Sequence, residues 1–125
     1  MAIWNLGSIN IDHVYRLDSL PQPGETLASR GYAQGLGGKG ANQSVAAARA
    51  GATTHHLGAM GSGDDWVRDR LAQAGVDMGH VARLDDQATG HAIILLDADA
   101  ENAIVIHPGA NRAIDEAALT DALST

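Results

Sequence analysis

The chain lacks cysteine and phenylalanine, and it contains one lysine, Lys39. Without cysteine there is no disulfide framework, thiolate metal site or thiol nucleophile. Basic residues are also scarce, with 8 Lys+Arg against 15 Asp+Glu and a net charge of −7, which argues against nucleic acid as a partner. Long apolar runs are missing, and Met1 is not followed by a basic leader, so we expect no signal peptide or membrane span and a cytoplasmic protein.

What is present is an alternation of short apolar segments and helical patterns. Residues 2–6 and 53–59 read as buried core strands, and an Ala-rich helix is predicted between them over residues 43–50, ending at Gly51. Strand, glycine-rich segment, helix and strand in this order predict an α/β fold with a parallel sheet flanked by helices. At 125 residues the chain forms one domain at most.

A second amphipathic helix is predicted after residue 62. Val67, Leu71 and Ala74 follow one another at i, i+4 and i+7, which places them on one apolar stripe. Ser62 is the predicted N-cap, and Gly75 is predicted to end the helix. A short strand over residues 81–84 and a last helix beginning at residues 115–116 complete this part of the pattern.

Other strand-like segments lie outside the alternation. Residues 91–96 and 103–107 are β-type runs joined by a polar loop, which predicts a hairpin. Residues 13–17 alternate apolar and polar side chains, and residues 27–34 are weakly strand-like. The hairpin is compatible with an ordinary core, a mobile lid or a sheet used for pairing.

The segment from Gly35 to Asn42 places four glycines around Lys39. Glycine permits close backbone approach, and a helix start offers unpaired N–H groups, so the segment predicts a floor for a small, polar, oxygen-rich ligand. It is not a Walker A loop, because Gly40 stands where Ser or Thr is needed. Gly35, Gly37 and Gly40 match the glycine spacing of a dinucleotide-binding fingerprint, which stays an alternative. Against it, the preceding segment is a poor candidate for a buried strand, and the next strand does not end in an acidic residue that could bind a ribose.

Asn10 and Asp12 form the second polar constellation. They come just past the end of the first strand, where ligands sit in parallel α/β folds. Two residues apart on an extended segment, their side chains point the same way. A carboxylate and an amide so placed can bind vicinal hydroxyls. The alternative is a turn in which Asn10 or Asp12 caps its own backbone.

The six histidines match no metal-ligand spacing. His55 and His56 would point to opposite faces of a strand. Satisfied or surface roles are therefore expected, with no metal site in this chain.

Together the motifs resemble the amino-terminal half of the ribokinase-like (PfkB) sugar kinases. The resemblance covers nearly the whole chain, in order and at family-like spacing. The motifs that carry it are Gly7-Ser8-Ile9-Asn10-Ile11-Asp12-His13, Pro23-Gly24-Glu25-Thr26, Gly37-Gly38-Lys39-Gly40-Ala41-Asn42-Gln43, Gly58-Ala59-Met60-Gly61-Ser62-Gly63-Asp64-Asp65, Thr89-Gly90, Asn102 and His107-Pro108-Gly109-Ala110-Asn111.

The resemblance implies a sugar site and a small β lid over it. The residues it assigns to the sugar are Asn10, Asp12, Gly38, Lys39, Gly40 and Asn42. The strands near 13–17, 27–34, 91–96 and 103–107 would form the lid, through which members of the family often pair as homodimers.

The resemblance also implies a reaction: ATP-dependent phosphorylation of a primary hydroxyl of a pentose, D-ribose first, with Mg²⁺ on the phosphates and a possible monovalent-cation site. The family's catalytic aspartate lies in a later Gly-Ala-Gly-Asp-type motif, beyond the motifs matched here, so no catalytic residue is expected in this chain. The alternative is a non-catalytic sugar-binding fragment or pseudoenzyme that lacks the nucleotide site.

Overall fold

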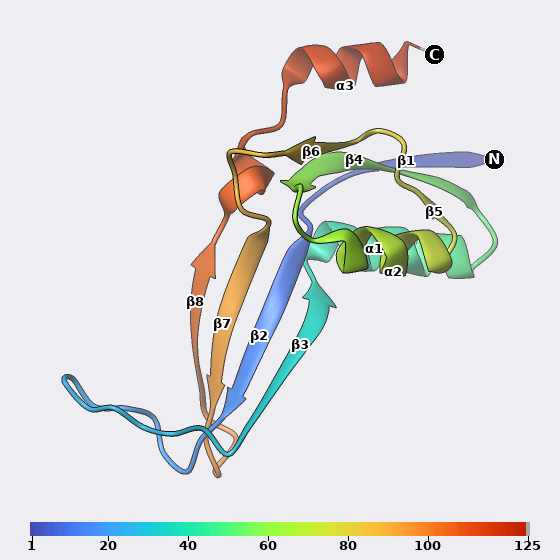
Figure 1. The fold of residues 1–125 in the computed structure, drawn as a ribbon. Coiled ribbons are helices and arrows are strands. Elements are labelled where there is room, and N and C mark those ends of the chain that lie inside the picture. The colour runs from blue at the N-terminus through green and yellow to red at the C-terminus, as the bar shows by residue number, and fades with distance from the viewer. Residues whose placement is uncertain (125) are drawn as a thin grey trace.

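The computed structural model describes residues 1–124, which form two four-stranded sheets and the helices that cover one of them (Figure 1). In chain order the elements are β1 Ala2–Leu6, β2 Asn10–Arg16, β3 Gly31–Gly37, α1 Lys39–Arg49, β4 Thr53–Gly61, α2 Asp65–Gln73, β5 Val76–Asp77, β6 Val81–Leu84, β7 Gly90–Leu96, β8 Asn102–His107, the 3₁₀ helix η1 Gly109–Arg112 and α3 Glu116–Leu123. None of the helices in residues 1–124 is long and apolar enough to cross a membrane.

The first sheet is parallel throughout, as the alternating pattern predicts. Its centre is β4, which pairs with β1 along one edge. On its other edge β4 pairs first with β5 and then, nearer its C-terminal end, with β6. The mixed α/β class predicted from the sequence is therefore confirmed.

Strand β1 is less buried than the sequence suggests. Ala2, Ile3 and Leu6 are exposed, and Trp4 and Asn5 are half-buried. The prediction of a buried core strand is wrong because β1 has a strand neighbour on one edge only in residues 1–124.

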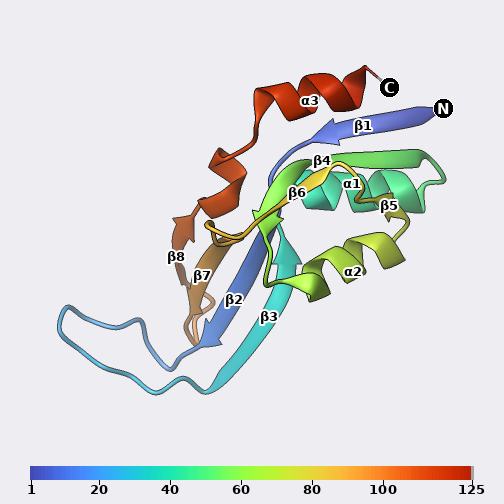
Figure 2. The same cartoon turned by 45° about the horizontal axis from the view of Figure 1, so that its top comes forward.

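Helices cover both faces of the parallel sheet. α1 and α2 lie on one face and α3 lies on the other, as the two views agree (Figures 1 and 2). The buried core fills the space between the sheet and the first two helices, and its members are Ile9, Ile11, Ala41, Met60, Val67, Leu71, Val76, Met78 and Val81. Val67 and Leu71 are the predicted apolar stripe of α2.

The ends of α2 differ in how well they were predicted. Gly75 follows the helix with φ 97° and so ends it as expected. The N-cap is Asp64 and not Ser62. The carbonyl of Ser62 accepts a hydrogen bond from Arg83 instead, while the side chain of Asp64 accepts from Thr89, the residue before β7.

The second sheet has the order β3-β2-β7-β8 and stands apart from the parallel sheet (Figure 1). β2 pairs antiparallel with β3 and parallel with β7, and β7 pairs antiparallel with β8 in the predicted hairpin. β3 begins at Gly31 and not near residue 27. The reason is its register with β2: Arg16, the last residue of β2, pairs with Gly31, and the chain before it keeps only one hydrogen bond to β2, from the N–H of Arg30 to the carbonyl of Arg16.

The glycine segment is therefore not a loop. Its first part, through Gly37, is the end of β3, and α1 begins at Lys39 rather than at residue 43. Gly38 alone connects them, with φ 93°, a conformation that favours glycine. This places the start of α1 directly beside the start of β2, which pairs with the end of β3.

Candidate functional site

Two glycines bring the β1–β2 turn and the first turn of α1 into backbone contact. A Cβ on Gly40 would lie 2.5 Å from the Cα of Gly7, and a Cβ on Gly7 would lie 2.6 Å from the Cα of Gly40. Beside this contact the N–H of Ala41 donates to the carbonyl of Ser8 over 2.9 Å. Only residues without side chains fit here, so the glycines set the spacing of the two segments that carry the predicted site residues.

Asn10 is held at the base of β2 by Asn111 in η1. The Nδ2 of Asn111 donates to Oδ1 of Asn10 over 2.7 Å. Asn111 also accepts from the N–H of Ile9 at 2.9 Å and donates to the carbonyl of Ile9 at 3.2 Å. Since the Oδ1 of Asn10 is engaged, its Nδ2 is the group left to donate to a ligand. The alternative of a self-capping turn does not hold, because Asn10 lies in a strand.

Asp12 lies on β2, two residues after Asn10, and is half-buried. Its carboxylate rests against the backbone of Gly37 on β3, where a Cβ would lie 2.5 Å from Oδ1. Within residues 1–124 the carboxylate has neither an ion-pair nor a hydrogen-bond partner. A partly buried carboxylate without a protein partner is available to accept hydrogen bonds from a ligand.

The face of the second sheet that carries Asn10 and Asp12 is lined by small residues on β3. Side chains directly opposite one another in a sheet share a face. By this register Asn10 lies opposite Gly37, and Asp12 lies opposite Gly35. On the other side of β2, Asp12 pairs with Ala92 of β7. On both adjoining strands, the residue opposite Asp12 is therefore a short one.

The remaining predicted residues lie at the start of α1. Gly38 packs against the carbonyl of Ser8, and Lys39 and Asn42 are exposed. Lys39 makes no ion pair within residues 1–124. Asn42 lines a hollow of about 280 Å³ between α1 and α2, where its neighbours include Leu36 and Arg49. The structure therefore places Gly38 beside the backbone N–H of Asn10 and places Asp12 against the neighbouring Gly37, whereas the described residues show no side-chain contact from Lys39 or Asn42 to Asn10 or Asp12.

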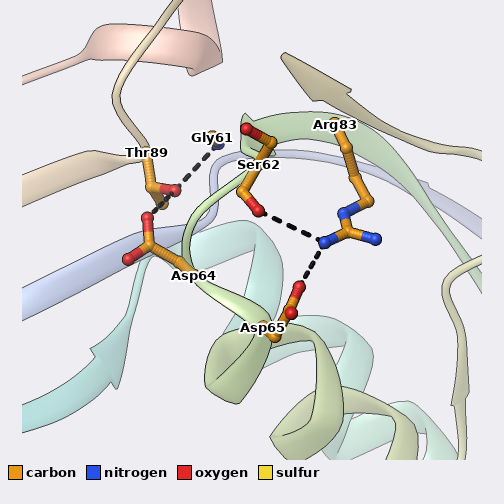
Figure 3. Close-up of polar contacts among 6 residues, drawn as sticks. All are labelled: Gly61, Ser62, Asp64, Asp65, Arg83 and Thr89. Atoms are coloured by element: carbon orange, nitrogen blue, oxygen red, sulfur yellow. Dashed lines mark hydrogen bonds and ion pairs between the residues drawn. The ribbon is translucent and has the colours of Figure 1, made fainter. Parts of the chain in front are cut away.

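A threonine joins the two sheets at the end of β4 (Figure 3). Thr89, directly before β7, is 2% exposed. Its hydroxyl donates to the carboxylate of Asp64 over 2.5 Å and accepts from the N–H of Gly61 over 2.8 Å. Beside it, the exposed guanidinium of Arg83 contacts Asp65 and the carbonyl of Ser62. The start of α2 is thereby attached to the first residues of β7.

Behind the Gly7–Gly40 contact lies a chain of buried polar side chains. Ser44 and His56 are both 0% exposed, and their Oγ and Nδ1 atoms are 2.7 Å apart. The Nε2 of His56 donates to the carbonyl of Gly7 over 3.0 Å. Burial lowers the pKa of His56 from its usual 6.5, and the bond to the Gly7 carbonyl opposes this shift in part. His56 is therefore neutral at pH 7.

No group of three or more His, Cys, Asp or Glu side chains in the described residues is arranged to hold a metal ion. His55, on the opposite face of β4 from His56, pairs with Asp77 over 3.1 Å. The hydrogen bond from the N–H of Gly79 is the largest cause that lowers the pKa of Asp77 below 3.8. Burial opposes this shift, and the charges of His55 and His80 lower the pKa by smaller amounts.

The dinucleotide alternative loses its structural basis. A dinucleotide fingerprint requires a strand of the parallel sheet immediately before the glycines. Here Gly35 and Gly37 lie on β3, which belongs to the second sheet and pairs antiparallel with β2.

Three residues of this region were not identified as site residues from the sequence: Asn111, Thr89 and His56. Asn111 and Thr89 stand in quoted motifs, but their partners are 101 and 25 residues away, and spacing along the chain does not reveal such contacts. For His56 the signal available was its place among apolar neighbours on β4, where a polar side chain needs a partner.

Comparison with known proteins places this arrangement in a family. A family model described as pfkB family carbohydrate kinase matches residues 3–124. The chain is 42% identical over 113 residues to the ribokinase of Haemophilus influenzae, in an alignment that covers 89% of this chain and 37% of that protein. The chain thus spans a little over a third of the length of this relative.

Solved structures show the same fold. The ribokinase of Cryptococcus neoformans, solved in complex with ADP, superposes with a TM-score of 0.82 at 43% identity, over 87% of this chain and 35% of that one. The ribokinase of Arabidopsis thaliana, solved with ribose and ATP, superposes with a TM-score of 0.85 at 30% identity, over 95% of this chain and 41% of that one.

Proposed function

Because the chain belongs to the pfkB family of carbohydrate kinases, we propose that it supplies the sugar-binding part of an ATP-dependent kinase acting on D-ribose. The observation that carries this proposal is the half-buried carboxylate of Asp12, which has no partner among residues 1–124. Two residues before it on β2, the Nδ2 of Asn10 is left to donate, because the Oδ1 of Asn10 is bonded by Asn111. The three similar proteins described above are all ribokinases, which supports ribose as the sugar.

The chemistry of the site suits a polyhydroxylated ligand. The two oxygens of Asp12 accept hydrogen bonds from vicinal hydroxyls, and the Nδ2 of Asn10 donates to a hydroxyl oxygen. The small residues Gly35 and Ala92 on either side of Asp12 leave space for a compact ring. Lys39 and the leading N–H groups of α1 add positive potential near the hydroxyls, and Gly38 and Gly40 allow the backbone to come close.

Phosphoryl transfer needs more than the residues of this chain provide. The sequence contains no phosphate-binding Walker A loop, and no acidic cluster fitted to Mg²⁺ occurs in the described part of the chain. As the family resemblance implies, we assign ATP, Mg²⁺ and any monovalent cation to other parts of a longer kinase that contains this chain. Asn10 and Asp12 bind and orient the sugar, and Asp12 is not the catalytic base.

The second sheet is proposed to act as a lid over the sugar and to pair two subunits. The outer strand β8 is exposed along its whole length, and it carries Ile104, Val105 and Ile106 at 51%, 67% and 65% exposure. An exposed apolar edge strand is a template for pairing with another chain. A lid that closes over the sugar would exclude water from the transfer step.

A second candidate is a non-catalytic sugar-binding module, the alternative that the sequence left open. Both functions require the same sugar site. Release of ADP on addition of ribose and ATP distinguishes the two candidates. If the protein is a kinase, a longer protein that contains this chain should release ADP. If it is a non-catalytic module, it should bind ribose without releasing ADP.

The test of the sugar site is titration of the chain with D-ribose by calorimetry. Asp12→Ala is expected to abolish binding, and Lys39→Ala to weaken it less because the glycine backbone remains. Asp18→Ala, which removes an exposed carboxylate paired with Arg30, is the matched control and should bind as the parent does. Equal ribose affinity in Asp12→Ala and the parent would refute the site. 2-Deoxy-D-ribose, which lacks one of the vicinal hydroxyls, should bind more weakly than D-ribose.

A further inference from the structure

We propose that His56 and Ser44 are positioning residues of the sugar site, holding the β1–β2 turn against the first turn of α1. Neither is among the residues assigned to the sugar. The effect on sugar affinity rests on the proposed function, whereas the positioning itself does not.

The hydrogen bonds of this buried chain fix the orientation of each member. The carbonyl of Gly7 can only accept, so the Nε2 of His56 carries the proton and donates to it over 3.0 Å. The Nδ1 of neutral His56 must then accept, and its donor is the hydroxyl of Ser44 at 2.7 Å. Ser44 in turn accepts from the Nδ2 of Asn5 at 2.9 Å. Each side chain therefore has one arrangement that satisfies its neighbours.

The two backbone ends of the chain coincide with the two segments of the site. At one end His56 holds the carbonyl of Gly7, and at the other Asn5 donates to the carbonyl of Gly40 over 2.8 Å. Gly7 and Gly40 are the glycines in backbone contact. Gly58 contributes space, since a Cβ there would lie 3.1 Å from the Nε2 of His56. The polar chain thus connects the turn that leads to Asn10 with the helix start that carries Lys39.

Burial makes this link specific. An apolar side chain in place of His56 removes the side-chain donor to the half-buried Gly7 carbonyl and leaves the buried Ser44 hydroxyl without its acceptor. The β1–β2 turn is then no longer held at a fixed position relative to the start of α1. Small displacements of the groups that bind the ligand lower its affinity. The remaining direct tie is the bond from the Ala41 N–H to the Ser8 carbonyl, which makes that amide a reporter.

The experiment is amide hydrogen exchange of the 125-residue chain followed by NMR, with no ligand present. In His56→Leu and Ser44→Ala the Ala41 N–H should exchange at least about tenfold faster than in the parent. The N–H of Leu17, bonded to Leu96 across the second sheet, should change less. The double variant should exchange no faster than the faster single variant, because the two residues act as one unit.

Thr54→Val is the matched control. Thr54 is 1% exposed on the same strand and bonds the carbonyl of Ala52, away from the site, so the variant should leave the ratio of Ala41 to Leu17 exchange unchanged. An equal acceleration at Ala41 and Leu17 in the His56 and Ser44 variants, no acceleration, or the same ratio change in Thr54→Val would overturn the proposal. If His56→Leu does not fold, the ratio of Ala41 to Leu17 exchange is compared between the parent and Ser44→Ala, which removes a single hydroxyl.

Ribose affinity, measured on the same samples, should fall about tenfold in both site variants and stay unchanged in Thr54→Val. A parent chain that does not bind ribose refutes the proposed function and leaves the exchange result intact. A parent that binds ribose, with variants that bind equally well, refutes positioning and leaves the function intact.

Discussion

The side-chain amide of Asn111 donates a 2.7 Å hydrogen bond to the side-chain oxygen of Asn10, joining residues 101 positions apart. Asn111 also bonds the N–H and the carbonyl of Ile9. A residue of η1 thus fixes both the side chain and the backbone at the start of β2, two residues before Asp12. This contact makes the geometry of the proposed sugar site depend on the segment that follows the hairpin.

Asn111→Ala should destabilise the chain by about 1–3 kcal/mol, because the Ile9 N–H and the Asn10 oxygen lose their partner. It should also weaken ribose binding about tenfold, since Asn10 is then free to rotate. Urea unfolding and calorimetric titration measure the two effects. Asn102→Ala, at an exposed position of β8, is the control and should change neither. An Asn111→Ala chain with parental ribose affinity would show that Asn10 needs no support.

Thr89 is expected to matter more for stability than the nearby ion pair. Thr89→Val deprives the Gly61 N–H and the Asp64 carboxylate of their bonds, at a cost of about 1–3 kcal/mol. Arg83→Gln breaks the ion pair between Arg83 and Asp65, whose side chains are 41% and 71% exposed, respectively. This variant should lower the free energy of unfolding by less than about 1 kcal/mol. Urea midpoints of the two variants give the order directly, and a larger loss in Arg83→Gln would contradict it.

The stability of the chain should depend on pH through His56. Burial lowers the folded-state pKa of His56 below 6.5, the usual value, which we take for the unfolded chain. Below pH 6.5 the unfolded chain takes up a proton that the folded chain does not, so the free energy of unfolding falls as the pH drops toward the folded-state pKa. Above pH 6.5 the contribution is fully present.

His56→Leu removes this proton uptake. The difference in urea midpoint between pH 7.5 and pH 5.5 should therefore be smaller in His56→Leu than in the parent. The pKa of Asp77 is lowered below 3.8, so the titration of Asp77 does not contribute to the difference between pH 7.5 and pH 5.5. Identical pH dependence in the two proteins would exclude a depressed pKa at His56.

The exposed strand β8 should mediate self-association. Ile106→Lys places a charge on the edge strand and is expected to convert an associating chain into a monomer in sedimentation velocity. Asn102→Lys adds the same charge at the start of β8, four residues from Ile106, and should associate as the parent does. If Ile106→Lys sediments like the parent, the contact surface lies elsewhere.

Elements set by local chemistry could be predicted from the sequence. The last helix begins where expected, and the carboxylate of Asp115 accepts from the N–H of Ala117 over 2.9 Å as an N-cap does. Gly75 ends α2 because it adopts positive φ. The β7–β8 hairpin follows from two β-type runs around a polar loop.

Elements set by distant partners could not be predicted. The bounds of β3 depend on its register with β2, and the exposure of β1 depends on which strands neighbour it. In the candidate site, Asn10 and Asp12 stood out because their spacing on a strand aims them together. The support from Asn111 and from His56 comes from segments far along the chain, so only the folded arrangement shows it.

The most direct test of the account is calorimetric unfolding of the 125-residue chain with and without millimolar D-ribose. A ligand stabilises only the state that binds it, by about 2.7 kcal/mol at a hundredfold excess over Kd. The account predicts one cooperative transition that ribose shifts upward, and no shift in Asp12→Ala. A transition that ribose leaves in place, or no cooperative transition at all, would contradict the claim that the sugar site forms within these residues.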